Sequence, residues 1–225
     1  MVKKISRKQL LKSTDEFITL SERIVNFARQ NQRLLQICGV VIASVFVIYL
    51  AVNAYISRVN NKGQQAYNNA YNALARESDP GSRNKSLEDA EKFFTQVIDE
   101  YGMSKVARLA LPQLAYIKFR SGKYDEAIGL YKKFMNKVLG NKQYEAMTSI
   151  AIASCYESKN DIGKAIEALE AVSSDQQSPF REIAMFNLGR LYRLDNRPEK
   201  EKEILNQFIE NFSNSPFVQM AKARL

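Results

Sequence analysis

The chain of 225 residues contains no histidine, and this absence excludes more chemistry than any other feature of its composition. Without an imidazole, neither a Ser-His-Asp nor a Cys-His nucleophile arrangement can form, and the usual histidine-containing metal sites are excluded as well. Glycine and proline are scarce, with 9 and 5 residues. These low counts exclude a collagen-like or linker-dominated chain and favour a helical fold over a β fold with many turns.

Cysteine is also rare, with two residues in very different surroundings. Cys38 lies inside an apolar run, whereas Cys155 lies far downstream in a helical pattern, beside Tyr156. Two such residues cannot build a disulfide framework, so we expect no structural disulfide. The helical surroundings of Cys155 predict a small core residue rather than a reactive thiolate.

One long stretch lacks charge altogether: 24 consecutive residues from Leu34 to Ser57, bounded by Arg33 and Arg58. As a helix it would be about 36 Å long, which exceeds a hydrocarbon core of about 30 Å. It therefore predicts a transmembrane helix over residues 34–57. The apolar run of a buried core helix is usually shorter. A cleaved signal peptide is the other alternative, because residues 52–54 formally supply a cleavage site, but the length of the run favours an uncleaved anchor.

Residues 1–33 form a short basic tail with eight Lys and Arg residues, which predicts a cytoplasmic N-terminus. Ser13 and Glu16 resemble a capping box, and apolar residues follow at helical spacing, so an amphipathic helix is predicted in this tail. The stripe consists of Phe17, Leu20, Ile24 and Phe27. The helix could lie on an anionic leaflet or contact a partner. An uninterrupted extension of the membrane helix is the alternative.

Residues 58–225 contain an internal repeat. Helical segments beginning at Leu87, Tyr124, Ile162 and Pro198 share one pattern. When they are aligned, one position is occupied by Ala90, Ala127, Ala165 and Glu201, at spacings of 37, 38 and 36 residues. A period of this length without alternating strand patterns predicts an all-α fold, an α-solenoid of stacked helix hairpins with about three to four repeats.

The repeats resemble the tetratricopeptide-repeat (TPR) family. Residues 186–192, FNLGRLY, are similar to its W-x2-L-G-x2-Y helix, with Met185 at the aromatic position. Leu114-Ala115 and Ile152-Ala153 occupy the Leu-Gly positions of two earlier repeats, Tyr156 takes the tyrosine position, and residues 122–127 match the turn that precedes the second helix. The resemblance covers residues 64–225.

Small residues are expected where helix axes cross, because helices packed about 8–10 Å apart leave little room there. The expected positions are Ala115, Ala127, Ala153, Ala165 and Gly189. Departures from the pattern carry further predictions. Lys118 at a tyrosine position predicts a rotated helix, and Glu201 with Lys202 predicts a solvated first turn. Residues 76–86 predict a long polar loop, and residues 215–217 predict the start of a short terminal helix that covers the last repeat.

A search for chemistry finds no glycine-rich phosphate loop and no dinucleotide fingerprint. Residues 82–85 match an S-x-x-K pattern without its companion motifs, which chance explains. We therefore expect no enzyme: no catalytic residues, metal, cofactor or small-molecule substrate. Residues 58–225 carry a net charge of only +4 and no dense basic stripe, so nucleic-acid binding is not expected either.

Resemblance to the TPR family implies a protein-binding groove, because peptide ligands of that family commonly dock on the concave face lined by the first helices. Carried over position by position, the groove residues are Tyr116, Phe119, Arg120, Ser154, Glu157, Phe186, Arg190 and Arg193. Aromatic side chains beside arginines suit extended segments that are partly apolar or acidic.

The order of the parts, a basic tail, one membrane helix and a TPR domain, resembles the bacterial YfgM family, an accessory of the Sec translocon. The resemblance implies a single-pass inner-membrane protein with a periplasmic domain that contacts secretory chains or a membrane-anchored chaperone. Anchoring would raise the effective concentration of the groove for local partners. The alternative is an envelope scaffold that docks proteins of cell-wall or outer-membrane biogenesis.

Overall fold

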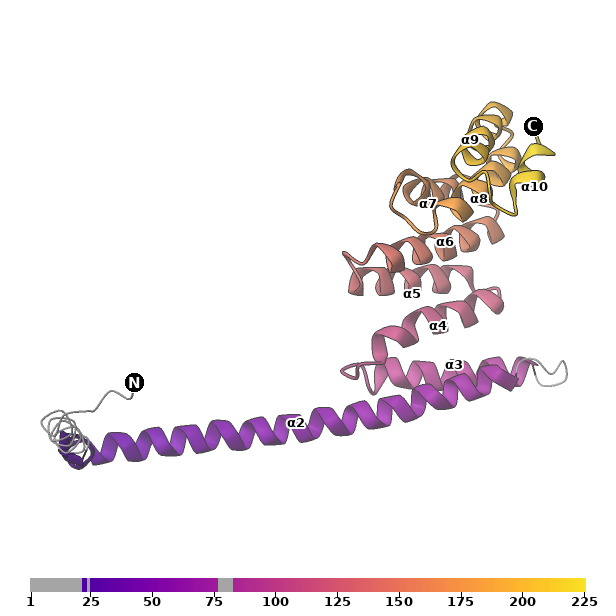
Figure 1. Cartoon of the computed structure of the whole chain (residues 1–225). Coiled ribbons are helices and arrows are strands. Elements are labelled where there is room, and N and C mark those ends of the chain that lie inside the picture. The colour runs from indigo at the N-terminus through magenta and orange to yellow at the C-terminus, as the bar shows by residue number, and fades with distance from the viewer. Residues whose placement is uncertain (1–21, 24, 77–82) are drawn as a thin grey trace, which may run out of the picture. The chain divides into compact units, whose positions relative to one another are not determined.

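The computed structural model describes residues 22–23, 25–76 and 83–225, and these residues form helices joined by short turns (Figure 1). No strand occurs in the described part of the chain. The all-α prediction is therefore confirmed. Contacts divide the chain into two compact units, residues 1–56 and 57–225.

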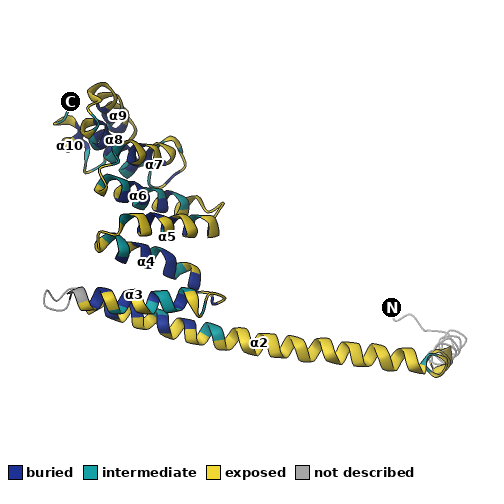
Figure 2. Cartoon of the chain, turned by 180° about the vertical axis from the view of Figure 1, so that it is seen from behind, coloured by how far each residue is buried: buried dark blue, intermediate teal, exposed yellow. Residues whose placement is uncertain are grey.

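Helix α2 (Gln32–Ala75) contains the whole apolar run. It is long and apolar enough to cross a membrane, and its residues 34–57 are exposed (Figure 2). Helical backbone continues upstream, where the Asn31 amide donates to the Phe27 carbonyl at 2.9 Å. This geometry favours the alternative, in which one helix continues from the apolar run into the tail. The predicted capping box and three residues of the apolar stripe lie outside the described residues.

The second unit is a stack of helix hairpins in which each helix from α3 onward packs against the next. The helices are α3 (Arg83–Asp99), α4 (Ala107–Arg120), α5 (Tyr124–Lys137), α6 (Lys142–Ser158), α7 (Ile162–Ser174), α8 (Arg181–Leu194), α9 (Pro198–Asn211) and α10 (Val218–Lys222). The predicted starts at Tyr124, Ile162 and Pro198 are correct. The prediction of a loop over residues 76–86 needs correction, because α3 already begins at Arg83.

Three equivalent turns join the first and second helices of the repeats. Each contains one residue in the left-handed region, with φ of 73° at Gly122, 62° at Asn160 and 55° at Asn196. In each turn the following amide donates to a carbonyl five residues back at 2.9 Å. Glycine and asparagine adopt this conformation more easily than other residues. The local sequence therefore ends each first helix and starts the second at the same point of the repeat.

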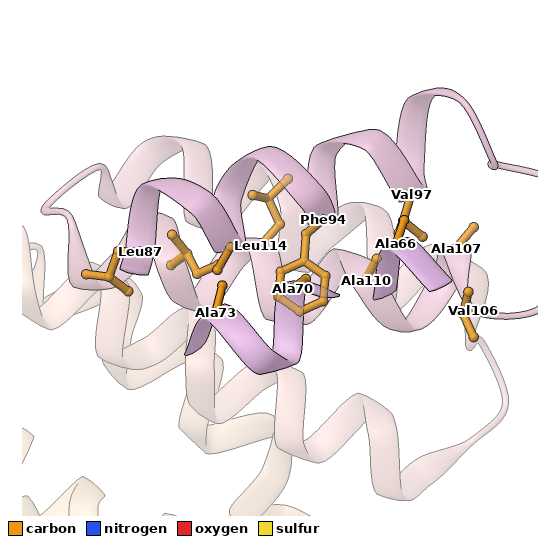
Figure 3. Close-up of a cluster of buried hydrophobic side chains, with 12 residues drawn as sticks. Ala66, Ala70, Ala73, Leu87, Phe94, Val97, Val106, Ala107, Ala110 and Leu114 are labelled. Atoms are coloured by element: carbon orange, nitrogen blue, oxygen red, sulfur yellow. The ribbon is translucent and has the colours of Figure 1, made fainter. Parts of the chain in front are cut away.

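Small residues lie at the helix crossings, as predicted. Ala115, Ala127, Ala153 and Ala165 are buried in the clusters that join successive helices. In the first repeat, Ala66, Ala70 and Ala73 of α2 contribute to a cluster around the ring of Phe94 (Figure 3). The part of α2 beyond the apolar run is thus the first helix of this repeat.

Lys118 does not mark a rotated helix, which corrects the prediction from the sequence. Its ammonium lies 2.8 Å from Glu91 of α3 and 2.6 Å from Glu126 of α5, so it bridges the helices on either side of α4. Burial by itself would lower the pKa of Lys118, but its hydrogen bonds to Glu126 and Glu91 raise the pKa above its ordinary value. In the next two repeats the position of Lys118 is occupied by Tyr156 and Tyr192, and the position of Glu126 by Lys164 and Lys200. There the ammonium of each lysine lies over the ring of the tyrosine in the same repeat. A lysine–glutamate pair thus replaces the tyrosine–lysine pair of the later repeats.

Residues 198–200 of the first turn of α9 are exposed, and so is Lys202, but Glu201 is buried, which corrects the prediction for that residue. Glu201 is only 7% exposed, and its Oε1 lies 4.0 Å from Nε of Arg193 on α8. The carboxylate faces the preceding helix because Glu201 occupies the crossing position that alanine fills in the other repeats. The predicted terminal helix is confirmed as α10, whose Val218 and Ala221 pack in a cluster with Phe208.

Candidate protein-binding site

An open pocket of about 350 Å³ lies among helices α2, α4, α5 and α6. We call it the tyrosine pocket. None of its lining residues is charged, and four of them are tyrosines. The lining consists of Tyr67, Leu109, Pro112, Gln113, Tyr116, Tyr131, Phe134, Tyr144, Met147, Thr148 and Ala151. An uncharged, aromatic concavity with a few hydroxyl groups has the chemistry of a site for apolar or aromatic side chains.

The walls of the pocket are formed by side chains spaced three and four residues apart on α4 and α6, the first helices of two repeats. Leu109, Pro112 and Tyr116 follow one another at three and four residues along α4, so they share one face. Tyr144 and Met147 do the same at the start of α6, where Asn141 caps the helix by accepting a hydrogen bond from the Tyr144 amide at 3.2 Å. The cap fixes the first turn of α6, and thereby the position of both side chains.

Tyrosine rings that line the pocket are held by contacts with neighbouring rings. Tyr67 of α2 contacts Phe94 edge to face, with centroids 5.5 Å apart, and Tyr144 meets Phe134 in the same way at 5.7 Å. Such pairs restrict the orientation of the rings. The pocket is therefore formed by packing that exists before any partner arrives.

The hydroxyl groups of the inner tyrosines stay protonated at physiological pH. Burial raises the pKa of Tyr131 to about 12, and the nearby Cys155 and Tyr116 act in the same direction. Burial, followed by a hydrogen bond with Tyr71, also raises the pKa of Tyr67. The pocket therefore offers neutral donors and apolar surface rather than charge.

Of the eight groove residues predicted from the sequence, only Tyr116 lines this pocket. Arg120 lies one turn further along α4, donates to the Tyr116 hydroxyl at 2.6 Å and places its guanidinium 5.6 Å from the ring centre. These two side chains form one unit at the mouth of the pocket. The arginine holds the ring and adds a positive charge beside it.

Phe119 and Phe186 belong to the core rather than to an open surface. Phe119 packs in the cluster of Ala115 and Ala127, with its ring 5.6 Å from that of Tyr124. Phe186 is 8% exposed and stacks on Phe217 at 4.9 Å. The terminal helix and the segment before it supply this cover. We leave both residues out of the proposed binding surface.

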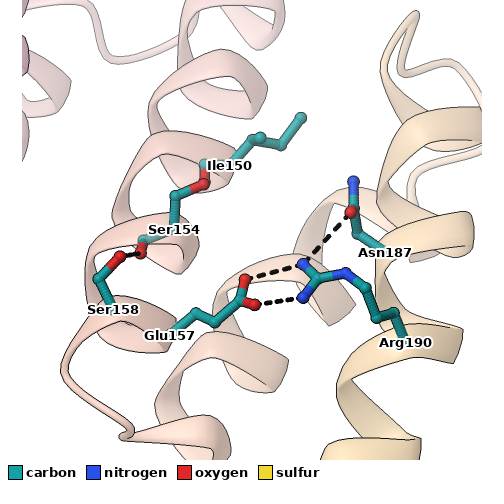
Figure 4. A network of polar contacts seen from close by, with 6 residues as sticks. All are labelled: Ile150, Ser154, Glu157, Ser158, Asn187 and Arg190. Carbon is teal, nitrogen blue, oxygen red and sulfur yellow. Dashed lines mark hydrogen bonds and ion pairs between the residues drawn. The ribbon is translucent and has the colours of Figure 1, made fainter.

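A second predicted pair meets between α6 and α8. Glu157 and Arg190 form a two-pronged ion pair, in which Nη2 of Arg190 lies 2.8 Å from Oε2 of Glu157 (Figure 4). Ser154 is one turn before Glu157 and donates to the Ile150 carbonyl at 3.1 Å. Arg193 turns towards Glu201 of α9. The predicted residues thus form separate groups instead of one continuous row.

We expect the Glu157–Arg190 pair to make the stability of the domain depend on pH. The hydrogen bond from Arg190 holds the pKa of Glu157 below its ordinary range, against the opposing effect of burial. A lowered carboxyl pKa contributes stability that is complete above the unfolded value of about 4.3 and is lost as the pH falls through the folded value. At pH 7, Glu157→Gln should cost at most about 1 kcal/mol, because the pair is partly exposed.

Urea unfolding of wild type and Glu157→Gln at several pH values tests this expectation. The difference in unfolding free energy should shrink as the pH falls below the ordinary carboxyl range. Asp99→Asn on the exposed surface of α3 is the matched control and is measured at the same pH values. A difference that stays constant down to strongly acid pH contradicts the assignment.

Within the described residues, no group of three or more His, Cys, Asp or Glu side chains could hold a metal ion. Cys155 is fully buried in a cluster with Ala115 and Tyr131, and burial raises the pKa of its thiol to about 11. Such a thiol is a poor nucleophile at neutral pH. Cys155 is a small core residue, as the sequence predicted.

Sequence reasoning missed most of the tyrosine pocket. The signal for α4 was present, since Leu109 and Pro112 precede Tyr116 at helical spacing. The same spacing links Tyr144 to Met147 and Ala151 on α6. Tyr67 and Tyr131 could not be found in this way, because they come from other helices and are brought together only by packing.

Comparison with known families agrees with this architecture. The family described as the SusR N-terminal TPR domain matches residues 58–212, which is more than half of the chain. The chain belongs to this family. No curated protein matches it. The match places this chain among TPR proteins, which generally act through protein–protein contacts rather than catalysis, and it does not extend to the YfgM family.

Solved structures with the same fold include TPR proteins from different sources. A TPR protein from Parabacteroides merdae has a TM-score of 0.60 at 16% identity over 73% of this chain, and this chain spans 59% of that protein's length. A putative kinesin light chain from Podosopora anserina gives 0.54 at 17%, covering 75% of this SusR-type chain and 84% of the other. A MamA RS-1 double mutant gives 0.53 at 18%, covering 72% and 90%. At these identities the likeness shows the TPR fold only.

Proposed function

We propose that this SusR-type TPR protein is a membrane-anchored module that binds an extended segment of a partner protein in the tyrosine pocket. The observation that carries the proposal is the pocket itself, an uncharged cavity of about 350 Å³ between the first helices α2, α4 and α6. Tyr116, Tyr144 and Met147 are exposed at its mouth, so a partner can reach it.

The chemistry of the mouth defines the partner segment. Apolar side chains would enter the pocket, where the rings and Met147 provide contact area without a charge that needs compensation. Arg120, beside Tyr116, adds a charge that favours an acidic residue or a terminal carboxylate next to the apolar side chain. We therefore propose a segment in which an apolar or aromatic residue is followed closely by an acidic one.

Membrane anchoring is the second part of the proposal. The uncharged run over residues 34–57 lies in a single helix whose length and composition permit a span. The basic tail supports an N-terminus in the cytoplasm and a domain on the other side of the membrane, which in a bacterial inner membrane is the periplasm. Only five residues separate the run from Gly63, the first buried residue of the domain, so the domain stays close to the bilayer.

Truncation of one ring should weaken partner binding strongly. Tyr116→Ala removes an aromatic anchor, and such residues commonly account for about 2 kcal/mol, or roughly 30-fold in affinity. A photocrosslinking amino acid at Gln113, another residue of the pocket lining, reports occupancy in living cells. We expect specific adducts at Gln113 that decline by an order of magnitude in Tyr116→Ala.

Two controls make this experiment decisive. Tyr116→Phe keeps the ring and removes only the hydroxyl that accepts from Arg120, so adducts should largely persist. A crosslinker at exposed Lys133 on α5 samples surface outside the pocket. Equal adducts at Gln113 and Lys133, or no effect of Tyr116→Ala, would remove the tyrosine pocket from the proposed function.

The identity of the adducts decides between two cellular roles. The arrangement of tail, apolar helix and TPR domain supports an ancillary role beside the Sec translocon, with secretory chains or a membrane-anchored periplasmic chaperone as partners. Adducts with translocon subunits or nascent secretory chains are then expected. Adducts with enzymes of cell-wall or outer-membrane biogenesis would instead favour the envelope scaffold.

A further inference from the structure

The loop between α3 and α4, residues 100–106, is fastened to α2 directly after the apolar run. The Lys105 amide donates to Oδ1 of Asn60 at 2.9 Å. At Gly63 the approach is closer still, because an added Cβ would lie 2.7 Å from Oγ of Ser104 and 3.1 Å from Cβ of Tyr101. Only glycine permits this contact. The loop is therefore a fixed part of the second unit on the side of Asn60 and Gly63.

The position of Asn60 in the chain sets the height of this loop relative to the end of the apolar run. Asn60 follows Ser57, the last residue of the uncharged run, by three residues, or about 4.5 Å of helix. The run is long enough for a hydrocarbon core of about 30 Å, and headgroups extend the bilayer to about 40–45 Å. With the run in the bilayer, as proposed above, Asn60 and the loop attached to it lie at the level of the headgroups.

The surface around this loop has the chemistry of a bilayer contact. Met103 at its tip is 69% exposed, although it is a large apolar side chain. Four exposed basic residues belong to the loop or the adjoining turns of α2 and α4: Arg58, Lys62, Lys105 and Arg108. Two acidic residues, Asp99 and Glu100, are nearby in sequence, and Glu100 accepts a hydrogen bond from Gln96 at 3.0 Å. The basic side chains outnumber the acidic ones.

A shallow pocket beside the loop can receive a headgroup. It has a volume of about 210 Å³ and lies between α2 and α3. Its lining combines one lysine and one alanine with side chains that carry amide or hydroxyl groups: Lys62, Gln65, Ala66, Asn69, Gln96 and Tyr101. Donors of this kind, next to a positive charge, suit a phosphate oxygen.

We propose that residues 101–105, together with Lys62 and the pocket beside it, form a contact site for anionic phospholipid headgroups, with Met103 inserted at the interface. The inference rests on the proposed membrane span. It assigns the loop to lipid rather than to a protein because the attachment to Asn60 fixes the loop within one helical turn of the run. Basic residues next to an apolar tip bind such surfaces through charge and partial burial together.

The test uses the full chain, reconstituted into vesicles that contain quencher-labelled lipids. A fluorophore is attached to Met103→Cys in a background in which Cys38 and Cys155 are alanine. Leu194→Cys, which is 51% exposed at the far end of α8, is the matched control for an apolar surface position. We expect quenching at position 103 in vesicles of phosphatidylglycerol and phosphatidylcholine, less in phosphatidylcholine alone, and little at position 194.

Neutralising the basic side chains shows whether charge, and not only closeness to the membrane, holds the loop on the lipid. Lys62→Gln and Lys105→Gln should each lower the ratio of contacting to free loop about fivefold, which corresponds to about 1 kcal/mol per basic residue near an anionic surface. Lys133→Gln on α5 should leave the ratio unchanged. Quenching at position 103 that equals the control, or that ignores lipid charge, overturns the proposal.

Native Cys38 distinguishes failure of this inference from failure of the membrane span. It lies within the apolar run and is exposed on α2. When Cys38 alone carries the fluorophore, quenching by lipid supports the span independently of the loop. Quenching at Cys38 without quenching at position 103 refutes only the headgroup contact, whereas absence of quenching at both positions refutes the anchor as well.

Discussion

Phe94→Ala should lower the unfolding free energy of residues 57–225 by about 3–5 kcal/mol, the usual cost of removing a fully buried ring. Phe94 is completely buried, where it joins Ala66 and Ala70 of α2 to the helices that follow. Its ring also lies 5.5 Å from that of Tyr67 and 5.9 Å from that of Tyr71. The variant should therefore loosen the tyrosine pocket as well as the first repeat.

Phe93→Ala is the matched control, because the neighbouring ring is only partly buried. Urea unfolding followed by circular dichroism measures both variants. The loss should be clearly smaller for Phe93→Ala, since less apolar area leaves water on folding at this position. Equal losses would mean that α2 does not pack on α3 through the cluster around Phe94.

Gly189→Leu should destabilise the domain by about 1–3 kcal/mol through overpacking. A Cβ at position 189 would lie 2.6 Å from Cδ2 and 2.9 Å from Cγ of Leu205 on α9. Leu205 is fully buried, so its side chain has little space to move away. For a domain of this size the loss corresponds to a fall of about 2–4 °C in Tm for each kcal/mol.

Gly129→Leu on α5 provides the control for the change in helix propensity. No atom of another element lies within 4 Å of a Cβ added there, and the position is exposed. Leucine favours a helix over glycine by up to about 1 kcal/mol, so this variant should be as stable as wild type or more stable. A wild-type Tm for Gly189→Leu would show that α8 and α9 are not in close contact at this crossing.

Much of the fold could be predicted because its signals are local and periodic. The second helices begin at Tyr124, Ile162 and Pro198, where a left-handed turn residue two positions earlier ends the first helix. Repetition of such turns defines the TPR pattern and its period. The start of α3 was predicted less well, because the polar composition of residues 76–86 gives no sign that the helix begins at Arg83.

The predictions for Lys118 and Glu201 were wrong for a common reason. When it is considered alone, a charged residue at a position that is usually aromatic or small predicts a rotated helix or a solvated turn. In the folded chain Lys118 meets Glu91 and Glu126 on the two neighbouring helices, and Oε1 of Glu201 lies 4.0 Å from Nε of Arg193 on α8. The partner that makes burial of a charge tolerable cannot be identified from one helix.

The sequence by itself determined the apolar run, the period, the turn residues and the small residues at the crossings, because each of these depends on neighbours along one helix or one hairpin. Only the tertiary structure decided which side chains share a surface. It placed Phe186 under the terminal helix, joined Glu157 to Arg190, and assembled Tyr67, Tyr116 and Tyr144 around one pocket. The physical reason is that the relative rotation of successive helices is set by packing across the whole stack, and this rotation selects the residues that face a partner.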